Sequence, residues 1–136
     1  MSRPVLLDAS ALMAFIRKER GGERVLAELT TGQRSHLVSA AQLVEVEGKL
    51  VSDGSFTPEQ VRARLHQLGH LLNVQPFEVR AQRAAAFYYA RRRPYDLSLG
   101  DALCLGLAEL LEADVLTAEQ GWATLPDLPF AVELIR

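Results

Sequence analysis

Short apolar runs alternate with stretches of helical periodicity along the whole chain. Residues 5–7 form a wholly apolar run, which is typical of a strand buried on both faces of a sheet. Further strands are expected at 36–38, 71–74, 115–116 and 130–135. Apolar residues at helical spacing predict helices at 12–20, 25–32, 39–52, 57–68, 78–93 and 100–111, and a short helical turn at 117–122. This alternation predicts a three-layer α/β/α fold with a mostly parallel central sheet of about five strands.

Three of these helices carry start signals. Ser39 is followed three residues later by Gln42, which has the form of a capping box. Thr57 stands before Pro58 and three residues before Gln60, a stronger signal because proline suits the first helical position. Ser98 is expected to cap the very apolar helix over 100–111.

The composition suits one domain over residues 1–136. Hydrophobic residues make up 49% of the chain and charged residues 24%, as in ordinary globular proteins. A single cysteine, Cys104, indicates a reducing compartment and no internal disulfide framework. No signal peptide and no membrane-spanning apolar run is visible, so we expect a cytoplasmic protein without membrane contact.

Acidic residues fall where the strands of such a sheet end. Asp8 ends the first strand, and Glu119 follows the strand at 115–116. Glu45 and Asp101 lie early in helices that can pack beside the same edge. Because ligands of open parallel sheets bind outside the carboxyl ends of the strands, we expect these four carboxylates to converge.

Converging carboxylates indicate a divalent-metal site. Carboxylate and water oxygens suit Mg²⁺, with Mn²⁺ as a possible substitute. Two such ions about 4 Å apart activate water and stabilise the leaving oxygen of a phosphodiester. Without metal, crowded carboxylates repel one another and tend to take up protons.

Each acid also has a purely structural interpretation. Asp8 can cap the following helix, and Asp101 has capping-box spacing to Ser98. Glu45 can pair with Lys49 at i,i+4, and Glu119 suits a first helical turn. The set of four, rather than any one member, carries the functional interpretation.

Four sequence blocks resemble the PIN-domain family, and within it the VapC-type toxins. Residues 5–12 resemble the start of these proteins, and residues 39–46 resemble their second acidic block. The segment 97–105, with Ser98-Leu99-Gly100-Asp101, is the most specific match. Residues 115–122 resemble the final acidic block, although Glu119 stands where the family has aspartate. The blocks occur in family order over most of the chain.

This resemblance implies a PIN-like fold and a Mg²⁺-dependent endoribonuclease that is the toxin of a type II toxin–antitoxin pair. It implies RNA as substrate, a VapB-like antitoxin as partner, and a homodimer. Asp8, Glu45 and Asp101 match the core metal-binding acids, with Glu119 as the fourth. Ser10 and Thr117 match polar positions that orient water or metal ligands, and both hydroxyls can also cap helices.

Other candidate residues have weaker patterns. His66 and His70 stand at i,i+4, but no third zinc ligand is evident. Cys104 is expected in the core. Glu47 competes with Glu45, which is favoured because Gln42, Glu45 and Lys49 form one polar stripe.

Two local features bear on nucleic-acid binding in a chain whose net charge is −2. Basic residues cluster at 17–20 and at 91–93. The arginines at 91–93 either contact RNA phosphates or are solvated at a helix end, where they complement its dipole. The aromatic residues at 87–89 can stack on bases, although at least one is expected to face the core or a dimer partner.

Two other functions remain open on the sequence alone. The first is a receiver-like phospho-acceptor domain, which also places acids at strand ends but needs an aspartate after the strand at 71–74. The second is a catalytically silent PIN-fold binding protein.

Overall fold

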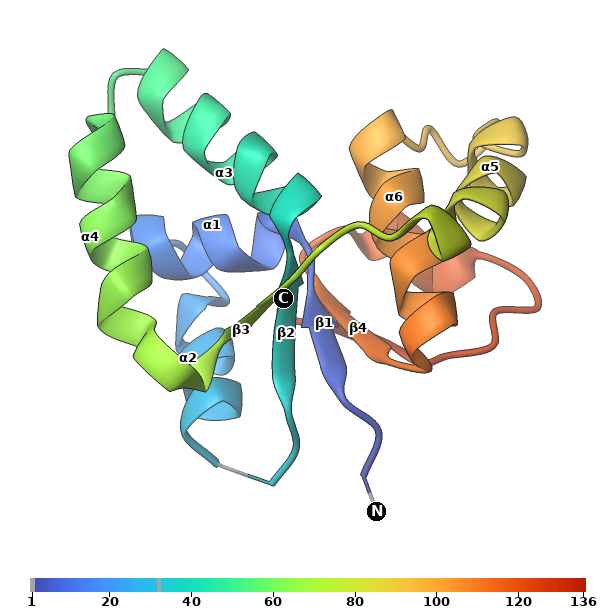
Figure 1. Cartoon of the computed structure of the whole chain (residues 1–136), viewed down its shortest axis with the longest axis horizontal. Helices are drawn as coiled ribbons and strands as arrows, with labels where there is room; N and C mark the ends of the chain where they lie inside the picture. Colours follow the sequence, from blue (N-terminus) through green and yellow to red (C-terminus); the bar gives the residue numbers. More distant parts are fainter. Residues whose placement is uncertain (1, 32) are drawn as a thin grey trace.

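The central sheet is parallel throughout the part of the chain that the structure, a computed structural model, describes: residues 2–31 and 33–136. Its strand order is β3-β2-β1-β4-β5 (Figure 1). The strands are β1 (Val5–Leu7), β2 (His36–Ser39), β3 (Asn73–Gln75), β4 (Asp114–Thr117) and β5 (Val132–Leu134). The predicted α/β class and five-stranded parallel sheet are confirmed.

Helices cover both faces of this sheet (Figure 1). The α-helices are α1 (Ala9–Arg17), α2 (Gly22–Thr31), α3 (Ala40–Ser52), α4 (Pro58–Leu68), α5 (Gln82–Ala90) and α6 (Leu99–Leu111). Short 3-10 turns are η1 (Gly69–Leu71), η2 (Val79–Ala81) and η3 (Gln120–Thr124). None of the helices in the described segments is long and apolar enough to cross a membrane.

The core is divided into two halves by the sheet. Leu7 and Leu116 pack with the helices α1–α4, whereas Leu6 and Val115 pack with α5 and α6. Successive strand residues point to opposite faces, so the wholly apolar runs supply both halves. The three-layer α/β/α arrangement follows directly.

Helices α5 and α6 approach each other closely at Gly106, which has no side chain. A Cβ atom placed at Gly106 would lie 2.5 Å from the backbone nitrogen of Ala85. No side chain larger than hydrogen fits there, so the two helices pack backbone to backbone along part of their length.

Several predicted boundaries differ from the observed ones. The third strand begins at Asn73, because Gly69–Leu71 forms a 3-10 turn. Helix α5 ends at Ala90, so the arginines at 91–93 follow the helix instead of closing it. The predicted end of the second helix near Gly32 lies outside the described residues.

Two of the three helix-start signals act as capping boxes. Thr57 and Gln60 bond reciprocally at the start of α4, and Ser98 and Asp101 do so at the start of α6. The capping box predicted at Ser39 is wrong. The Ser39 hydroxyl accepts from the backbone of Ala41, but the amide of Gln42 is engaged elsewhere in the fold.

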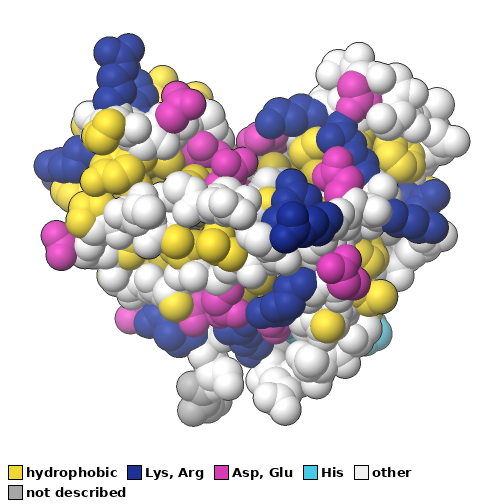
Figure 2. Space-filling model, turned by 180° about the vertical axis from the view of Figure 1, so that it is seen from behind, with side chains coloured by type: hydrophobic (Ala, Val, Ile, Leu, Met, Phe, Trp, Pro, Cys, Tyr) yellow, Lys and Arg dark blue, Asp and Glu magenta, His cyan; other side chains and the backbone are white. Residues whose placement is uncertain are grey.

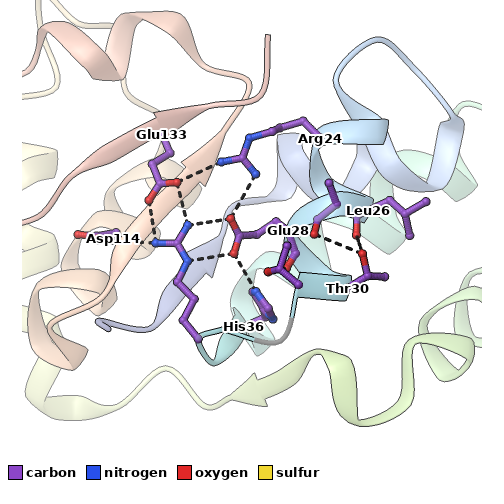
Figure 3. A network of polar contacts seen from close by, with 10 residues as sticks. Arg24, Leu26, Glu28, Thr30, His36, Asp114 and Glu133 are labelled. Atoms are coloured by element: carbon purple, nitrogen blue, oxygen red, sulfur yellow. Dashed lines mark hydrogen bonds and ion pairs between the residues drawn. The ribbon is translucent and has the colours of Figure 1, made fainter. Parts of the chain in front are cut away.

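A network of ion pairs joins α2, β5 and the segment before β2 at the amino end of the sheet (Figure 3). Arg34 donates to both carboxylate oxygens of Glu28, at 2.8 and 3.0 Å. It also donates to both oxygens of Glu133, at 2.8 and 2.9 Å. Arg24 bridges the same two carboxylates, and His36 contacts Glu28 at 3.0 Å. The arginines hold the pKa of Glu28 down at about 2, with the Arg34 hydrogen bonds as the largest cause.

Candidate active site

Asp8 is a buried carboxylate at the carboxyl end of β1. Its side chain is 3% exposed and caps α1 by accepting from the backbone N–H of Ala11 at 3.0 Å. The capping role expected from the sequence is therefore present. Burial raises the pKa of Asp8 to about 7, against the opposing effect of its hydrogen bonds.

Two hydroxyls hold both oxygens of Asp8. Ser10 Oγ donates to Asp8 Oδ1 at 2.7 Å, and Thr117 Oγ1 donates to Oδ2 at 2.9 Å. Ser10 also accepts from the backbone of Ala118, and Thr117 accepts from the backbone of Glu119. Since β1 and β4 are neighbouring strands, these bonds tie Asp8 to the segment that carries Glu119.

Glu45 is on α3, and its carboxylate lies against the start of α6. Its Oε2 accepts from Lys49 Nζ at 2.9 Å, so the i,i+4 pair expected from the sequence is present. Its Oε1 lies against Gly100, where a Cβ atom would overlap it. A glycine is required at residue 100 if Glu45 is to keep this position.

Asp101 and Glu119 complete the set from two further elements. Asp101 is in the first turn of α6, where one carboxylate oxygen, Oδ2, accepts from the backbone of Ser98 at 3.0 Å. Glu119 follows β4 and is partly exposed. Burial is the largest cause that raises the pKa of each carboxyl.

The carboxylates are close enough to repel one another. Glu45 raises the pKa of Asp101, and both Asp101 and Glu45 raise the pKa of Glu119. Glu119 in turn contributes to the raised pKa of Asp8. The ammonium of Lys49 has its own pKa raised, chiefly by the hydrogen bond to Glu45 and also by Asp101 and Glu119. Lys49 thus offsets part of the negative charge, and Arg136 adds to this at Glu119.

The four acids share the carboxyl edge of the sheet, as the sequence predicted. Figure 2 shows a deep notch at the top of the molecule with acidic side chains along its walls; α3 and α6 flank this notch in Figure 1. We call it the acidic cleft. Among the described residues, no group of three His, Cys, Asp or Glu side chains stands close enough to enclose an ion unaided.

This donor set still fits Mg²⁺. Magnesium keeps several waters and commonly uses only one or two carboxylates, so neighbouring acids that do not enclose the ion suit it better than a closed protein cage. The mutual repulsion of the carboxylates, described above, is relieved by a cation in the cleft.

Sequence reasoning missed how three residues shape the cleft. Gln42 is 2% exposed, and its amide accepts from the backbone of Ala9 at 3.1 Å and donates to Gly100 O at 3.0 Å. It therefore joins the starts of α1, α3 and α6. The polar stripe of Gln42, Glu45 and Lys49 was the available signal. The roles of Gly100 and Lys49 require knowledge of which helices meet.

The weaker candidates lie apart from this arrangement. Glu47 is within 3.7 Å of Arg62 and is not among the groups that shift the pKa values of the cleft. His66 and His70 are exposed. Cys104 is fully buried, as expected for a core residue, and burial raises the pKa of its thiol.

The aromatic residues on α5 have two different environments. Tyr88 is buried and donates to Glu109 at 2.7 Å, whereas Phe87 and Tyr89 are 51% and 37% exposed. The expectation that at least one of the three faces the core is confirmed for Tyr88.

The strand order excludes the receiver-like alternative. Receiver domains are doubly wound sheets of order 2-1-3-4-5, whereas this sheet has the order 3-2-1-4-5. The third strand, at the edge, also ends in Gln75 and carries no aspartate.

Solved structures with this fold include toxins of toxin–antitoxin pairs. VapBC2 from Rickettsia felis, bound to a promoter DNA fragment, matches with a TM-score of 0.76 at 15% identity, over 96% of this chain and 97% of the other. DNA-bound VapBC from Salmonella typhimurium gives 0.72 at 16% identity, over 99% and 100%. VapC20 from Mycobacterium tuberculosis, a sarcin–ricin loop cleaving toxin, gives 0.67 at 16% identity, over 88% and 94%. These likenesses concern the fold.

No curated protein matches the chain in sequence. The family model of the PIN domain does, over residues 5–128. That match includes all four acids of the cleft: Asp8 after β1, Glu45 on α3, Asp101 on α6 and Glu119 after β4. The chain therefore belongs to the PIN-domain family.

Proposed function

We propose that this protein is a Mg²⁺-dependent endoribonuclease and the toxin of a type II toxin–antitoxin pair. The observation that carries the proposal is the meeting of Asp8, Glu45, Asp101 and Glu119 at one edge of a PIN-family sheet. A PIN fold alone would not imply hydrolysis, because folds host many functions. The acids supply the chemistry.

Within this proposal Asp8, Glu45 and Asp101 would hold Mg²⁺, with Glu119 as the fourth acid. Bound Mg²⁺ supplies charge stabilisation at the phosphodiester and lowers the pKa of a coordinated water. Ser10 and Thr117 keep the Asp8 carboxylate in a fixed orientation through the bonds described above. Gln42 holds α6 and α1 at a fixed separation, so the positions of Asp8 and Asp101 are coupled.

RNA as substrate is supported by the likeness to VapC20, which is described as cleaving the sarcin–ricin loop. A VapB-like antitoxin as partner is supported by the likeness to VapBC complexes. A homodimer and a cytoplasmic location complete the proposal.

Cleavage by matched variants tests the proposal. Wild type with Mg²⁺ or Mn²⁺ is expected to cleave RNA, and Asp101→Asn and Glu45→Gln are expected to lower the rate at least about a hundredfold, the scale of losing one charge-stabilising group. Glu47→Gln is the control, because it makes the same kind of change on α3 outside the cleft. Circular dichroism and thermal unfolding check that each variant folds.

The substrate is best found in cells. Expression of wild type and of Asp101→Asn, followed by mapping of new RNA 5′ ends, shows whether one structured RNA is cut at one site. New ends that appear equally with both proteins would contradict the proposal. Mg²⁺ binding without any new ends would instead identify a silent PIN-fold binding protein.

A further inference from the structure

Helix α5 and the turn after it form the most basic part of the chain. From residue 79 to 95 there are five arginines and no aspartate or glutamate, although the whole protein carries a net charge of −2. The arginine–aromatic strip consists of Arg83, Phe87, Tyr89, Arg91, Arg92 and Arg93. All six side chains are at least partly exposed.

Two of these arginines are stacked on exposed aromatic rings. The Arg91 guanidinium lies 3.7 Å from the centroid of Phe87, and that of Arg92 lies 4.4 Å from Tyr89. Each also donates one bond to a backbone carbonyl, Arg91 to Phe87 at 3.1 Å and Arg92 to Tyr89 at 3.0 Å. A guanidinium held in this way keeps its remaining N–H donors free and loses little conformational entropy on binding phosphate.

The other basic cluster, at residues 17–20, is partly neutralised by acids. Arg17 is already paired with Asp53 and with Glu19. Within residues 2–31 and 33–136, no salt bridge involves Arg83, Arg91, Arg92 or Arg93. The charge of the strip is therefore available for an external anion.

The strip lies at the same end of the molecule as the acidic cleft. The backbone N–H of Leu97 donates to the carbonyl of Arg92, and the next residue, Ser98, caps the helix that carries Asp101. Figure 1 shows the link between α5 and α6 beside the start of α6, at the top of the molecule. A polymer that enters the cleft can continue over this turn.

A groove of about 930 Å³ runs beside the strip. Arg83, Phe87 and Arg91 line it together with the acids Glu109, Glu112 and Asp127. A polyanion is therefore attracted to the arginines of α5 and repelled by these acids, which favours the strip over the rest of the groove.

We infer that the arginine–aromatic strip binds the RNA strand that leaves the acidic cleft. Arg91 and Arg92 contact backbone phosphates, and an unstacked base extends the stack that Arg91 forms with Phe87 or that Arg92 forms with Tyr89. Guanidinium groups and exposed rings together are the usual means of holding unpaired nucleotides, so the occupant is a single-stranded or loop segment. The inference rests on the proposed ribonuclease function and assigns the substrate surface.

Binding without cleavage tests the inference. In EDTA, fluorescence anisotropy measures the Kd of a 5′-fluorescein RNA stem-loop for wild type, for Arg91→Gln/Arg92→Gln, and for the control Arg62→Gln/Arg64→Gln. The control removes the same charge from α4, where Arg64 also stacks on an aromatic ring, Phe56. Helices α4 and α5 lie on opposite sides of the molecule (Figure 1).

The α5 double variant is expected to raise Kd about tenfold at 0.1 M KCl. Its slope of log Kd against log[KCl] should fall by about 1.4, because two arginine–phosphate pairs on a single strand are removed. Tyr89→Leu should raise Kd with little change of slope, because it removes stacking and no charge. Arg62→Gln/Arg64→Gln should change Kd by less than twofold and should leave the slope close to that of wild type.

Equal effects in the α5 and α4 variants would overturn the inference, since they would indicate only bulk charge. An unchanged Kd for RNA with weakened binding of the antitoxin would also overturn it and assign the strip to that protein. Cleavage assays with Mg²⁺ separate the two proposals. If wild type cleaves RNA and Arg91→Gln/Arg92→Gln has an unchanged KM, the inference about the strip alone is refuted. If wild type cleaves no RNA, in vitro or in cells, the proposed ribonuclease function is refuted.

Discussion

Gly100 shares the narrow space between α3 and α6 with the carboxylate of Glu45. Gly100→Ala is expected to displace that carboxylate, because the new Cβ would overlap Oε1. The displaced atom is the end of a flexible side chain, so the fold is retained, and alanine favours a helix over glycine by up to about 1 kcal/mol. RNA cleavage should fall at least tenfold, in the same way that small misplacements of reacting groups lower rates.

Gly48→Ala is the control for this substitution. Gly48 also lies in a helix, α3, but has open space where its Cβ would be. Both variants should unfold at or above the temperature of wild type, and only Gly100→Ala should lose activity. Full activity of Gly100→Ala would show that the position of Glu45 does not matter.

The residues also show where sequence reasoning succeeds. Ser98 and Asp101 lie three positions apart, and their capping box formed as the spacing predicted. Ser39 and Gln42 have the same form, but Gln42 bonds instead to Ala9 and Gly100, which lie 33 and 58 residues away. Local patterns predict local bonds, and they fail when a distant partner competes for the same side chain.

At the scale of elements, Arg34 joins α2 to the edge strand β5. Arg34→Met would leave Glu28 and Glu133 without this partner, and Glu28 is buried. Removing one member of a buried ion pair costs up to about 3–5 kcal/mol of the free energy of unfolding. Arg24 still bridges both carboxylates, so the loss is expected towards the lower end of that range. Urea denaturation at pH 7 measures this loss.

Arg80→Met is the matched control, since Arg80 pairs with Glu78 at the surface. An exposed pair of this kind contributes at most about 1 kcal/mol. Because the pKa of Glu28 is lowered from 4.5 to about 2, its contribution is complete above about pH 4.5 and is lost as the pH falls towards 2. A loss in Arg34→Met no larger than in Arg80→Met would show that the network adds little.

The elements themselves were largely predictable, because short apolar runs and helical periodicity differ clearly. The start of β3 was not. Leu71 and Leu72 continue the apolar run, yet the backbone turns through Gly69–Leu71 before the strand begins at Asn73. That choice depends on how the edge strand meets β2, which the local sequence does not record. The four acids could be assigned to one edge of the sheet, whereas the contact between Glu45 and Gly100 depends on how α3 packs against α6.

At the scale of the whole molecule, the acidic cleft makes stability depend on pH and on metal. The pKa of Asp8 is raised to about 7, so between about pH 4 and 7 the folded protein binds more protons than the unfolded chain. The free energy of unfolding in EDTA should therefore fall as the pH rises through this range and level off above 7. Asp8→Asn should flatten that decline.

Mg²⁺ should oppose the decline, because a bound cation stabilises the ionised carboxylates of the folded state. Its stabilising effect is expected to be larger at pH 8 than at pH 5, as measured by thermal unfolding with and without EDTA. Asp127→Asn, a change at an exposed acid in a loop, is the control. A profile that is flat for wild type in EDTA would contradict the assignment of a buried, ionisable Asp8.

The backbone contact between Gly106 and Ala85 has a consequence for the cleavage products. It makes α5 and α6 one rigid hairpin, so the rings of the strip cannot move far from Asp101. An RNA base held on Phe87 or Tyr89 would then fix the number of nucleotides between itself and the bond that is cut. The fixed distance along the hairpin would then help to determine which phosphodiester bond is cut. The distance from an unpaired base would matter as much as the sequence at the cleavage site.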